Sequence, residues 1–121
     1  MTILLIEDEE GDLKLVTRIL AHEGHRIIGV HSAEEAIDLL DADREHPEVI
    51  LTDLRLPRMD GVTLARHLKA DPKTAAIPVA AMSSHIESYT VAEMIAAGFA
   101  LILPKPLSGR TLPQQLVALL A

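Results

Sequence analysis

Five short apolar runs recur along the chain, and each is followed by loop or polar residues. Runs of this length are typical of β-strands, and their nearly continuous apolar content indicates strands that are covered on both faces of a parallel sheet. An alternating pattern, with one face in water, is absent from them. The predicted strands are residues 2–6, 26–30, 48–52, 78–82 and 100–103.

Between these runs, apolar residues recur at helical spacing, which predicts five helices that alternate with the strands. Boundary residues support this register. Gly24 can close the first helix in a left-handed cap, Ser32 with Glu35 predicts a capping box for the second, and Asp60 can cap the third. The apolar stripes are Leu13, Val16, Ile19 and Leu20, then Ala33, Ala36, Ile37 and Leu40, then Val62, Ala65 and Leu68, then Val91, Met94 and Ile95, and last Leu112, Leu116, Leu119 and Leu120.

Repeated alternation with short connections implies right-handed crossovers and an α/β fold. We predict a three-layer sandwich in which five helices cover both faces of a five-stranded parallel sheet. The expected strand order is 2-1-3-4-5, the flavodoxin-like arrangement. A chain of 121 residues has the size of one domain, so we expect residues 1–121 to form a single domain.

Composition narrows the range of partners. The formal net charge of −7 opposes binding to phosphate backbones and anionic lipids, so we expect no direct nucleic-acid contact and no membrane association. The first apolar run is too short for a membrane span or a signal-peptide core. The chain has no cysteine, which excludes disulfides and thiolate metal sites and fits a cytoplasmic location.

Polar side chains follow the predicted strands at their carboxyl ends, which is where open parallel sheets bind their ligands. Glu7 and Asp8 follow the first strand, and Asp53 follows the third. These two strands are neighbours in the predicted order, so the three carboxylates should meet. Ser83 follows the fourth strand and Lys105 the fifth, which adds a hydroxyl and an ammonium group to the same edge.

Three carboxylates in one pocket repel one another, and they stay ionised together only if a cation or many hydrogen bonds compensate. Mg²⁺ prefers oxygen ligands and keeps several waters, so two carboxylates and a backbone carbonyl would suffice to hold it. We therefore expect Mg²⁺ at this edge. The alternative interpretation is a cluster of solvated loop acids, and we prefer it for Glu9 and Glu10.

Four segments of the chain resemble the receiver domains of two-component response regulators, and the match runs across essentially the whole sequence. Each segment alone is a weak signal, but together at these spacings they are specific. The segments are LLIEDEE at residues 4–10, LTDLRLPRMDG at 51–61, PVAAMSS at 78–84 and LPKP at 103–106.

The resemblance implies a role for each acidic residue. It makes Asp53 the phosphoacceptor. Asp8, Asp53 and the backbone carbonyl of Arg55 are expected to bind Mg²⁺, with Glu7 acting through a water molecule.

The same resemblance implies a phosphate clamp. Ser83 falls where the family has a Thr or Ser that hydrogen-bonds the phosphoryl group, and Lys105 falls where the family has a lysine that pairs with it. The bond between Lys105 and Pro106 is expected to be cis.

The implied function is a phosphorylation-dependent signalling switch. Asp53 would take a phosphoryl group from a sensor histidine kinase, a histidine phosphotransfer protein or a small donor such as acetyl phosphate. The state would then be relayed to a downstream protein target, and a dimer that forms on phosphorylation belongs to the same expectation. We expect a phosphoacceptor with autodephosphorylation chemistry and not a turnover enzyme.

Four positions depart from the family pattern or modify it. Ile102 stands three residues before Lys105, where the family usually has an aromatic switch residue. Tyr89 on the fourth predicted helix is either a replacement signalling residue or an ordinary helix residue. By the same resemblance Arg55 and His85 flank the path of the hydrolytic water, and our hypothesis is that they slow autodephosphorylation; the alternative for His85 is an ordinary exposed loop residue.

Other functions fit the sequence less well. An FMN-binding flavodoxin needs a glycine- and hydroxyl-rich loop after the first strand, where this chain has acids, and a haloacid-dehalogenase-like phosphatase has its nucleophile after the first strand and not the third. The serious alternative is a receiver-like interaction module that works without phosphorylation. The sequence leaves open whether the chain works alone or within a longer regulator.

Overall fold

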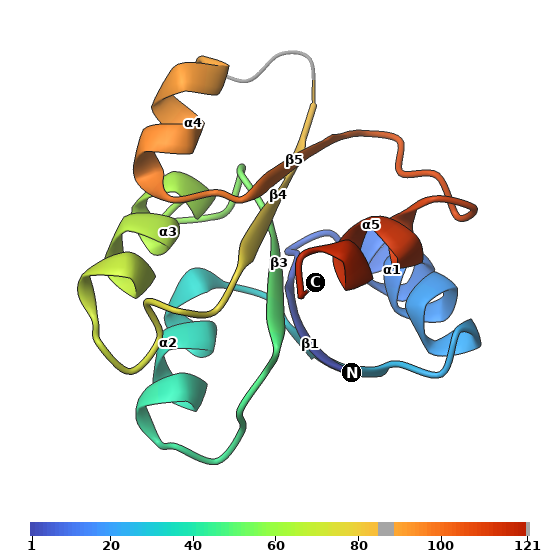
Figure 1. The fold of residues 1–121 in the computed structure, drawn as a ribbon, viewed down its shortest axis with the longest axis horizontal. Coiled ribbons are helices and arrows are strands. Elements are labelled where there is room, and N and C mark those ends of the chain that lie inside the picture. Colours follow the sequence, from blue (N-terminus) through green and yellow to red (C-terminus); the bar gives the residue numbers. More distant parts are fainter. Residues whose placement is uncertain (85–88, 121) are drawn as a thin grey trace.

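The structure, a computed structural model, describes residues 1–84 and 89–120. In these residues, strands and helices alternate from the first element to the last (Figure 1). The elements are β1 (Thr2–Ile6), α1 (Glu10–His22), β2 (Arg26–Val30), α2 (Ala33–Asp41), β3 (Val49–Asp53), α3 (Gly61–Ala70), β4 (Val79–Ser83), α4 (Val91–Ala97), β5 (Leu101–Pro104) and α5 (Leu112–Ala118).

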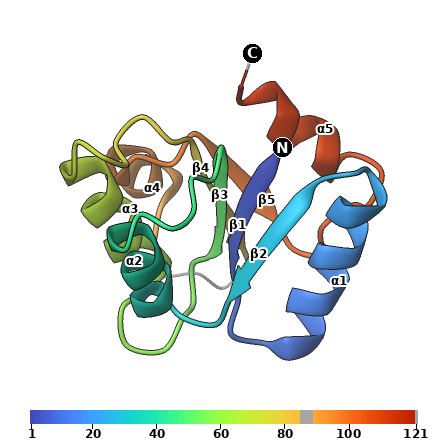
Figure 2. The ribbon, with the colours of Figure 1, turned by 90° about the horizontal axis from the view of Figure 1, so that it is seen from below.

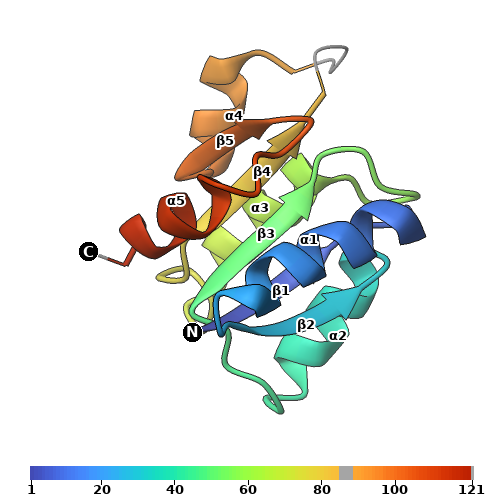
Figure 3. The ribbon, with the colours of Figure 1, turned by 90° about the vertical axis from the view of Figure 1, so that its right-hand side faces the viewer.

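The strands form one five-stranded sheet in the order β2-β1-β3-β4-β5, and every neighbouring pair is parallel (Figure 3). The helices α1 and α5 cover one face, while α2, α3 and α4 cover the other (Figures 1 and 2). The predicted three-layer α/β sandwich and its strand order are therefore confirmed.

Three strands are displaced by one residue from their predicted positions. The strands β3, β4 and β5 end at Asp53, Ser83 and Pro104, each one residue later than expected. The reason is that backbone pairing continues beneath the polar side chains, with Asp53 opposite Met82 and Ser83 opposite Pro104. Asp53 is thus part of the sheet and is held by its ladder, not by a loop.

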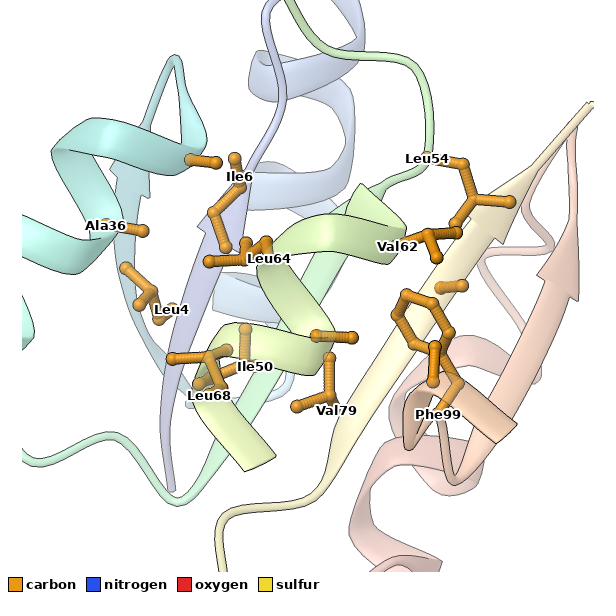
Figure 4. Packing of buried hydrophobic residues seen from close by; sticks show 14 of the residues in the cluster. Leu4, Ile6, Ala36, Ile50, Leu54, Val62, Leu64, Leu68, Val79 and Phe99 are labelled. Carbon is orange, nitrogen blue, oxygen red and sulfur yellow. The ribbon is translucent and has the colours of Figure 1, made fainter. Parts of the chain in front are cut away.

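The larger hydrophobic cluster lies between the sheet and the helices α2, α3 and α4 (Figure 4). The members of this cluster have at most 7% of their surface exposed, and each such Leu, Ile or Phe stabilises the fold by about 1.5–3 kcal/mol relative to an exposed position. The labelled members are Leu4, Ile6, Ala36, Ile50, Leu54, Val62, Leu64, Leu68, Val79 and Phe99.

A second cluster fills the space between the sheet and the helices α1 and α5. It uses the alternate residues of the same strands, because successive side chains of a strand point to opposite faces. Its members include Ile3, Leu5, Leu51, Leu13, Val16, Leu20, Leu112 and Leu116.

Two of the three predicted helix boundaries are confirmed. Gly24 adopts a positive φ of 85° just beyond α1, and the Asp60 carboxylate accepts from Thr63 N at the start of α3. Of the two hydrogen bonds that make the capping box predicted for α2, one is confirmed and the other is wrong. Ser32 Oγ accepts from Glu35 N, but the Glu35 carboxylate accepts from the backbone N–H of His31, whose ring also lies 3.9 Å from it.

The apolar stripe predicted for α4 is also wrong in part. Val91 and Ile95 have 59% and 61% of their surface exposed, whereas Met94 and Ala97 are buried. A helix of seven residues turns only one narrow side toward its neighbours, and Met94 and Ala97 occupy that side. At the end of the chain, Leu120 is likewise 44% exposed.

Candidate functional site

Three acidic side chains meet at the carboxyl edge of the sheet, as predicted. Glu7 and Asp8 follow β1 directly, and Asp53 is the last residue of β3, the strand beside it. Carboxylate oxygens of all three residues lie within 4.8 Å of one another. Glu7 and Asp53 are buried and Asp8 is exposed, so the cluster has one open side.

Lys105 reaches this cluster from the residue after β5. Its Nζ lies 2.8 Å from Asp53 Oδ2 and 3.1 Å from Glu7 Oε2, and it donates a hydrogen bond to each. The only X-Pro cis bond in the described residues joins Lys105 to Pro106, as expected. One ammonium thus compensates part of the negative charge, and the remainder suits a cation.

The electrostatics of this group follow from its burial. Loss of water around the Glu7 carboxylate raises its pKa to about 7, and the nearby charge of Asp53 adds to this rise against the hydrogen bonds from Glu9 N and Lys105. Burial alone would lower the pKa of Lys105, but its bonds to Asp53 and Glu7 outweigh that effect and raise it. Lys105 is therefore a fixed positive charge at neutral pH.

The backbone around Asp53 is held on both sides. Thr52 Oγ1 donates to the carbonyl of Asp53, and Arg55 N donates to Asp53 Oδ1 at 3.2 Å. Gly61, the first residue of α3, packs so closely that a Cβ there would collide with the Asp53 backbone. The turn between β3 and α3 therefore requires glycine at position 61 to keep the acceptor in place.

Ser83 ends β4 and lines a cavity of about 290 Å³ together with Lys105, Tyr89 and Ile102. Its Oγ donates to the backbone carbonyl of Ser84 at 3.1 Å. The predicted hydroxyl therefore stands at the same edge as the lysine, with its hydrogen bond made to its own neighbour in the chain.

The sequence did not single out Asp12, which the structure brings into the site. Asp12 lies in the first turn of α1, and its Oδ2 is 3.4 Å from Lys105 Nζ. The available signal was its position, because Asp12 lies four residues after Asp8, in the first turn of a helix that begins directly after the acidic pair.

Glu9 has a defined structural role beyond that of a solvated acid. It is the N-cap of α1, and its carboxylate accepts from Gly11 N and Asp12 N. These bonds hold its pKa below the usual range. Glu10 is exposed and lies 3.0 Å from the ring of His31.

Tyr89 does not belong to the fourth helix, so that part of its prediction is wrong. It precedes Thr90, the residue that caps α4 through a reciprocal capping box with Glu93. Its phenol donates to Asp60 Oδ2 at 2.8 Å and so links the start of α4 to the start of α3. Ile102 is partly buried against the larger cluster.

His85 lies outside the described residues. Of the described histidines, His25 is partly buried, and its Nδ1 lies 3.1 Å from the terminal amine. Among the described residues the only group of three potential metal ligands is the acidic one at the sheet edge. The helices of the described part are also too short or too polar to cross a membrane.

Comparison with known proteins identifies the class of domain that this fold and site define. The family model for the response regulator receiver domain matches residues 3–117. The chain therefore belongs to the response-regulator receiver domain family.

Individual relatives agree with this assignment. The polar-differentiation response regulator DivK of Brucella ovis is 34% identical over 83 residues, which are 69% of this chain and 66% of DivK. The match thus spans slightly less than two thirds of the relative's length.

Two solved structures are similar over almost the whole chain. The signal receiver domain of a signal transduction histidine kinase from Syntrophus aciditrophicus has a TM-score of 0.89 and 28% identity, covering 98% of this chain and 89% of that one. The receiver domain of sensor histidine kinase PA1611 from Pseudomonas aeruginosa PAO1 has a TM-score of 0.85 and 26% identity, covering 97% and 94%. That structure has a magnesium ion coordinated in its active-site cleft.

Proposed function

We propose that this receiver domain is a phosphorylation-dependent switch whose phosphoacceptor is Asp53. The observation that carries the proposal is the position of the Asp53 carboxylate, 2.8 Å from Lys105 Nζ and in one cluster with Glu7 and Asp8. A carboxylate so placed is a nucleophile with positive charge fixed beside it.

The acidic residues fit Mg²⁺. Three carboxylates that offer oxygen atoms within 4.8 Å of one another are the hard ligands that this ion selects. Asp8, Asp53 and the backbone carbonyl of Arg55 would hold it, with Glu7 acting through water. When bound, Mg²⁺ would neutralise charge on the oxygens of the transferring group. The magnesium-bound relative PA1611 supports this choice of ion.

In the transfer step, an Asp53 carboxylate oxygen attacks the phosphorus of a phosphohistidine. A new P–O bond forms, and the P–N bond breaks with its electron pair left on the imidazole nitrogen, which takes a proton from solvent. With acetyl phosphate, the P–O bond to the acetate breaks instead and acetate leaves. The product is an acyl phosphate on Asp53, and Lys105 stabilises the added charge on its oxygens.

Ser83 is the residue through which the phosphorylated state would be sensed. Its hydroxyl donates to the backbone carbonyl of its chain neighbour Ser84, and the phosphoryl group would offer a stronger, charged acceptor across the shared cavity. Movement of Ser83 at the end of β4 would then bias the segment that leads to α4.

The partners follow from this chemistry. The phosphoryl group would come from a sensor histidine kinase or a histidine phosphotransfer protein, and the output would be a contact with a downstream protein target, including a phosphorylation-dependent dimer. We propose a cytoplasmic switch that is phosphorylated on Asp53 and returns to its unphosphorylated state by autodephosphorylation, and not an enzyme with turnover. The rival function, an interaction module without phosphorylation, is favoured only by Ile102 at the usual aromatic position.

The test is to incubate the purified protein with Mg²⁺ and acetyl phosphate and to measure the intact mass. The wild type should gain one phosphoryl group, and Asp53→Asn and a sample without Mg²⁺ should not. Absence of any gain on the wild type, or an equal gain on Asp53→Asn, would reject the proposal.

A further inference from the structure

Lys105 is shared among three carboxylates, of which two belong to the site described above. Its Nζ lies 2.8 Å from Asp53, 3.1 Å from Glu7 and 3.4 Å from Asp12. An ammonium group has three N–H donors, so these three bonds use its full capacity. A phosphoryl group that is to bond Lys105 must therefore displace one of them.

Asp12 is the partner that gives way most readily. Its bond to Lys105 is the longest of the three, and its side chain is 46% exposed, against 1% for Glu7 and 9% for Asp53. Water can replace an exposed partner, whereas a buried carboxylate that loses its donor is left without solvation. Asp12 is thus both the outermost contact of Lys105 and the easiest to exchange.

Asp12 also places a negative charge close to the acceptor, because its Oδ2 lies 3.4 Å from Lys105 Nζ, which is itself 2.8 Å from Asp53 Oδ2. With Glu7 and Lys105 it lines a small cavity of about 80 Å³ beside α1. Phosphoryl donors are anions, and a donor that approaches Asp53 from solvent comes within a few ångströms of this charge. Like charges at that range repel, and the repulsion is greater for a donor that carries more charge.

We propose that Asp12 is a positioning residue that restrains phosphoryl transfer to Asp53, which rests on the proposed function of Asp53 as acceptor. In the unphosphorylated protein it occupies the third N–H of Lys105 and repels anionic donors. This restraint favours donors whose own binding surface compensates for the repulsion, such as a protein carrying phosphohistidine, over small free phosphates.

The experiment measures the rate of phosphorylation of the whole chain with Mg²⁺ and two small donors, acetyl phosphate as a dianion and phosphoramidate as a monoanion. Asp12→Asn should react about tenfold faster with acetyl phosphate, because removing one unit charge about 6 Å from a dianion under water-like screening lowers the barrier by about 1.4 kcal/mol; a monoanion at the same distance would gain only about threefold. The gain should be smaller with phosphoramidate and should shrink as salt is raised.

Two control variants separate this role from a general effect. Asp12→Glu restores the charge and should return the rate toward that of the wild type. Asp41→Asn removes the same unit charge from the exposed end of α2 and should leave the rate unchanged. Thermal unfolding of each variant shows whether loss of a first-turn acid has altered α1.

An Asp12→Asn rate equal to or below that of the wild type with acetyl phosphate would overturn the inference, as would the same gain in Asp41→Asn. Both results leave the proposed function intact, since the wild type is still phosphorylated on Asp53. If the wild type takes no phosphoryl group, the proposed function itself fails and the role of Asp12 fails with it.

Discussion

Lys105 donates a hydrogen bond to Asp53 across the carboxyl edge of the sheet, although the two residues stand 52 positions apart in the chain. The contact exists because β3 and β5 both flank β4 and run parallel to it, so their carboxyl ends lie at the same edge. The fold therefore brings an acceptor and its counter-charge together without any loop reaching across the molecule.

Replacing the proposed Mg²⁺ ligand Asp8 should change both the free energy of unfolding and its response to Mg²⁺. Glu7, Asp8 and Asp53 repel one another, so Mg²⁺ should raise the free energy of unfolding of the wild type, by about 2.7 kcal/mol at a concentration one hundred times its Kd. Asp8→Asn should be more stable than the wild type without Mg²⁺ because one repelling charge is gone, and should gain little from the ion. Thermal melts with Mg²⁺ and with EDTA measure both effects.

The prediction fails if Mg²⁺ stabilises Asp8→Asn as much as the wild type. Asp38→Asn, a change of the same charge on the exposed side of α2, is the matched control and should keep the full response to Mg²⁺.

A methyl group at position 61 should disturb the acceptor directly. Gly61→Ala would place a Cβ against the backbone of Asp53, which is anchored in the sheet and cannot move aside. We expect a loss of about 1–3 kcal/mol in the free energy of unfolding and slower phosphorylation. Gly109→Ala, where a new Cβ meets no atom closer than 3.7 Å, should change neither. Equal effects of the two substitutions in denaturant titrations would contradict the account.

Tyr89 offers a direct readout of its link to Asp60. The chain has one tyrosine and no tryptophan, so the phenolate absorbance in the near ultraviolet reports this residue alone. Its hydrogen bond to the Asp60 carboxylate raises the pKa of Tyr89 above the ordinary value for tyrosine. A raised pKa in the folded state means that the link stabilises the protein at lower pH and is lost as pH rises through that pKa.

Asp60→Asn is the informative variant, because asparagine still caps α3 but carries no charge. The spectrophotometric titration should then shift toward the ordinary value for tyrosine. A titration curve that is unchanged by this substitution would show that the phenol is not bonded to Asp60 in solution.

The lifetime of the phosphorylated state tests the two residues expected to obstruct hydrolysis. Arg55 is exposed beside Asp53, two positions beyond it, and His85 stands two positions beyond Ser83 in the sequence. If either side chain shields the acyl phosphate from water, Arg55→Ala or His85→Ala should shorten its half-life, measured by the decay of the intact phosphorylated mass. A half-life that neither substitution shortens would remove this proposal.

The positions of the strands and of the polar residues at their ends could be predicted from the sequence. Continuous apolar runs locate the strands to within one residue, and the parallel order that they predict places Glu7, Asp8, Asp53 and Lys105 at one edge, as the structure has them. These predictions succeeded because the position of a strand end is fixed by burial and alternation, which a sequence displays directly.

Features that depend on side-chain choice were less accessible. The carboxylate of Glu35 could bond either Ser32 or His31, and only the rotamer decides between them. The exposure of Val91 and Ile95 depends on how α4 is rotated against α3. Asp12 looked like one more acid of the first helix, and its contact with Lys105 depends on a pairing between the two ends of the chain.

The most direct test of the central claim is to locate the phosphoryl group on the chain. After phosphorylation with Mg²⁺ and acetyl phosphate, borohydride reduces an acyl phosphate of aspartate to homoserine, and peptide mass spectrometry then identifies the residue that has changed. We expect homoserine at position 53 and none at positions 8 and 12. Homoserine at another position, or none in a sample whose intact mass shows phosphorylation, would contradict it.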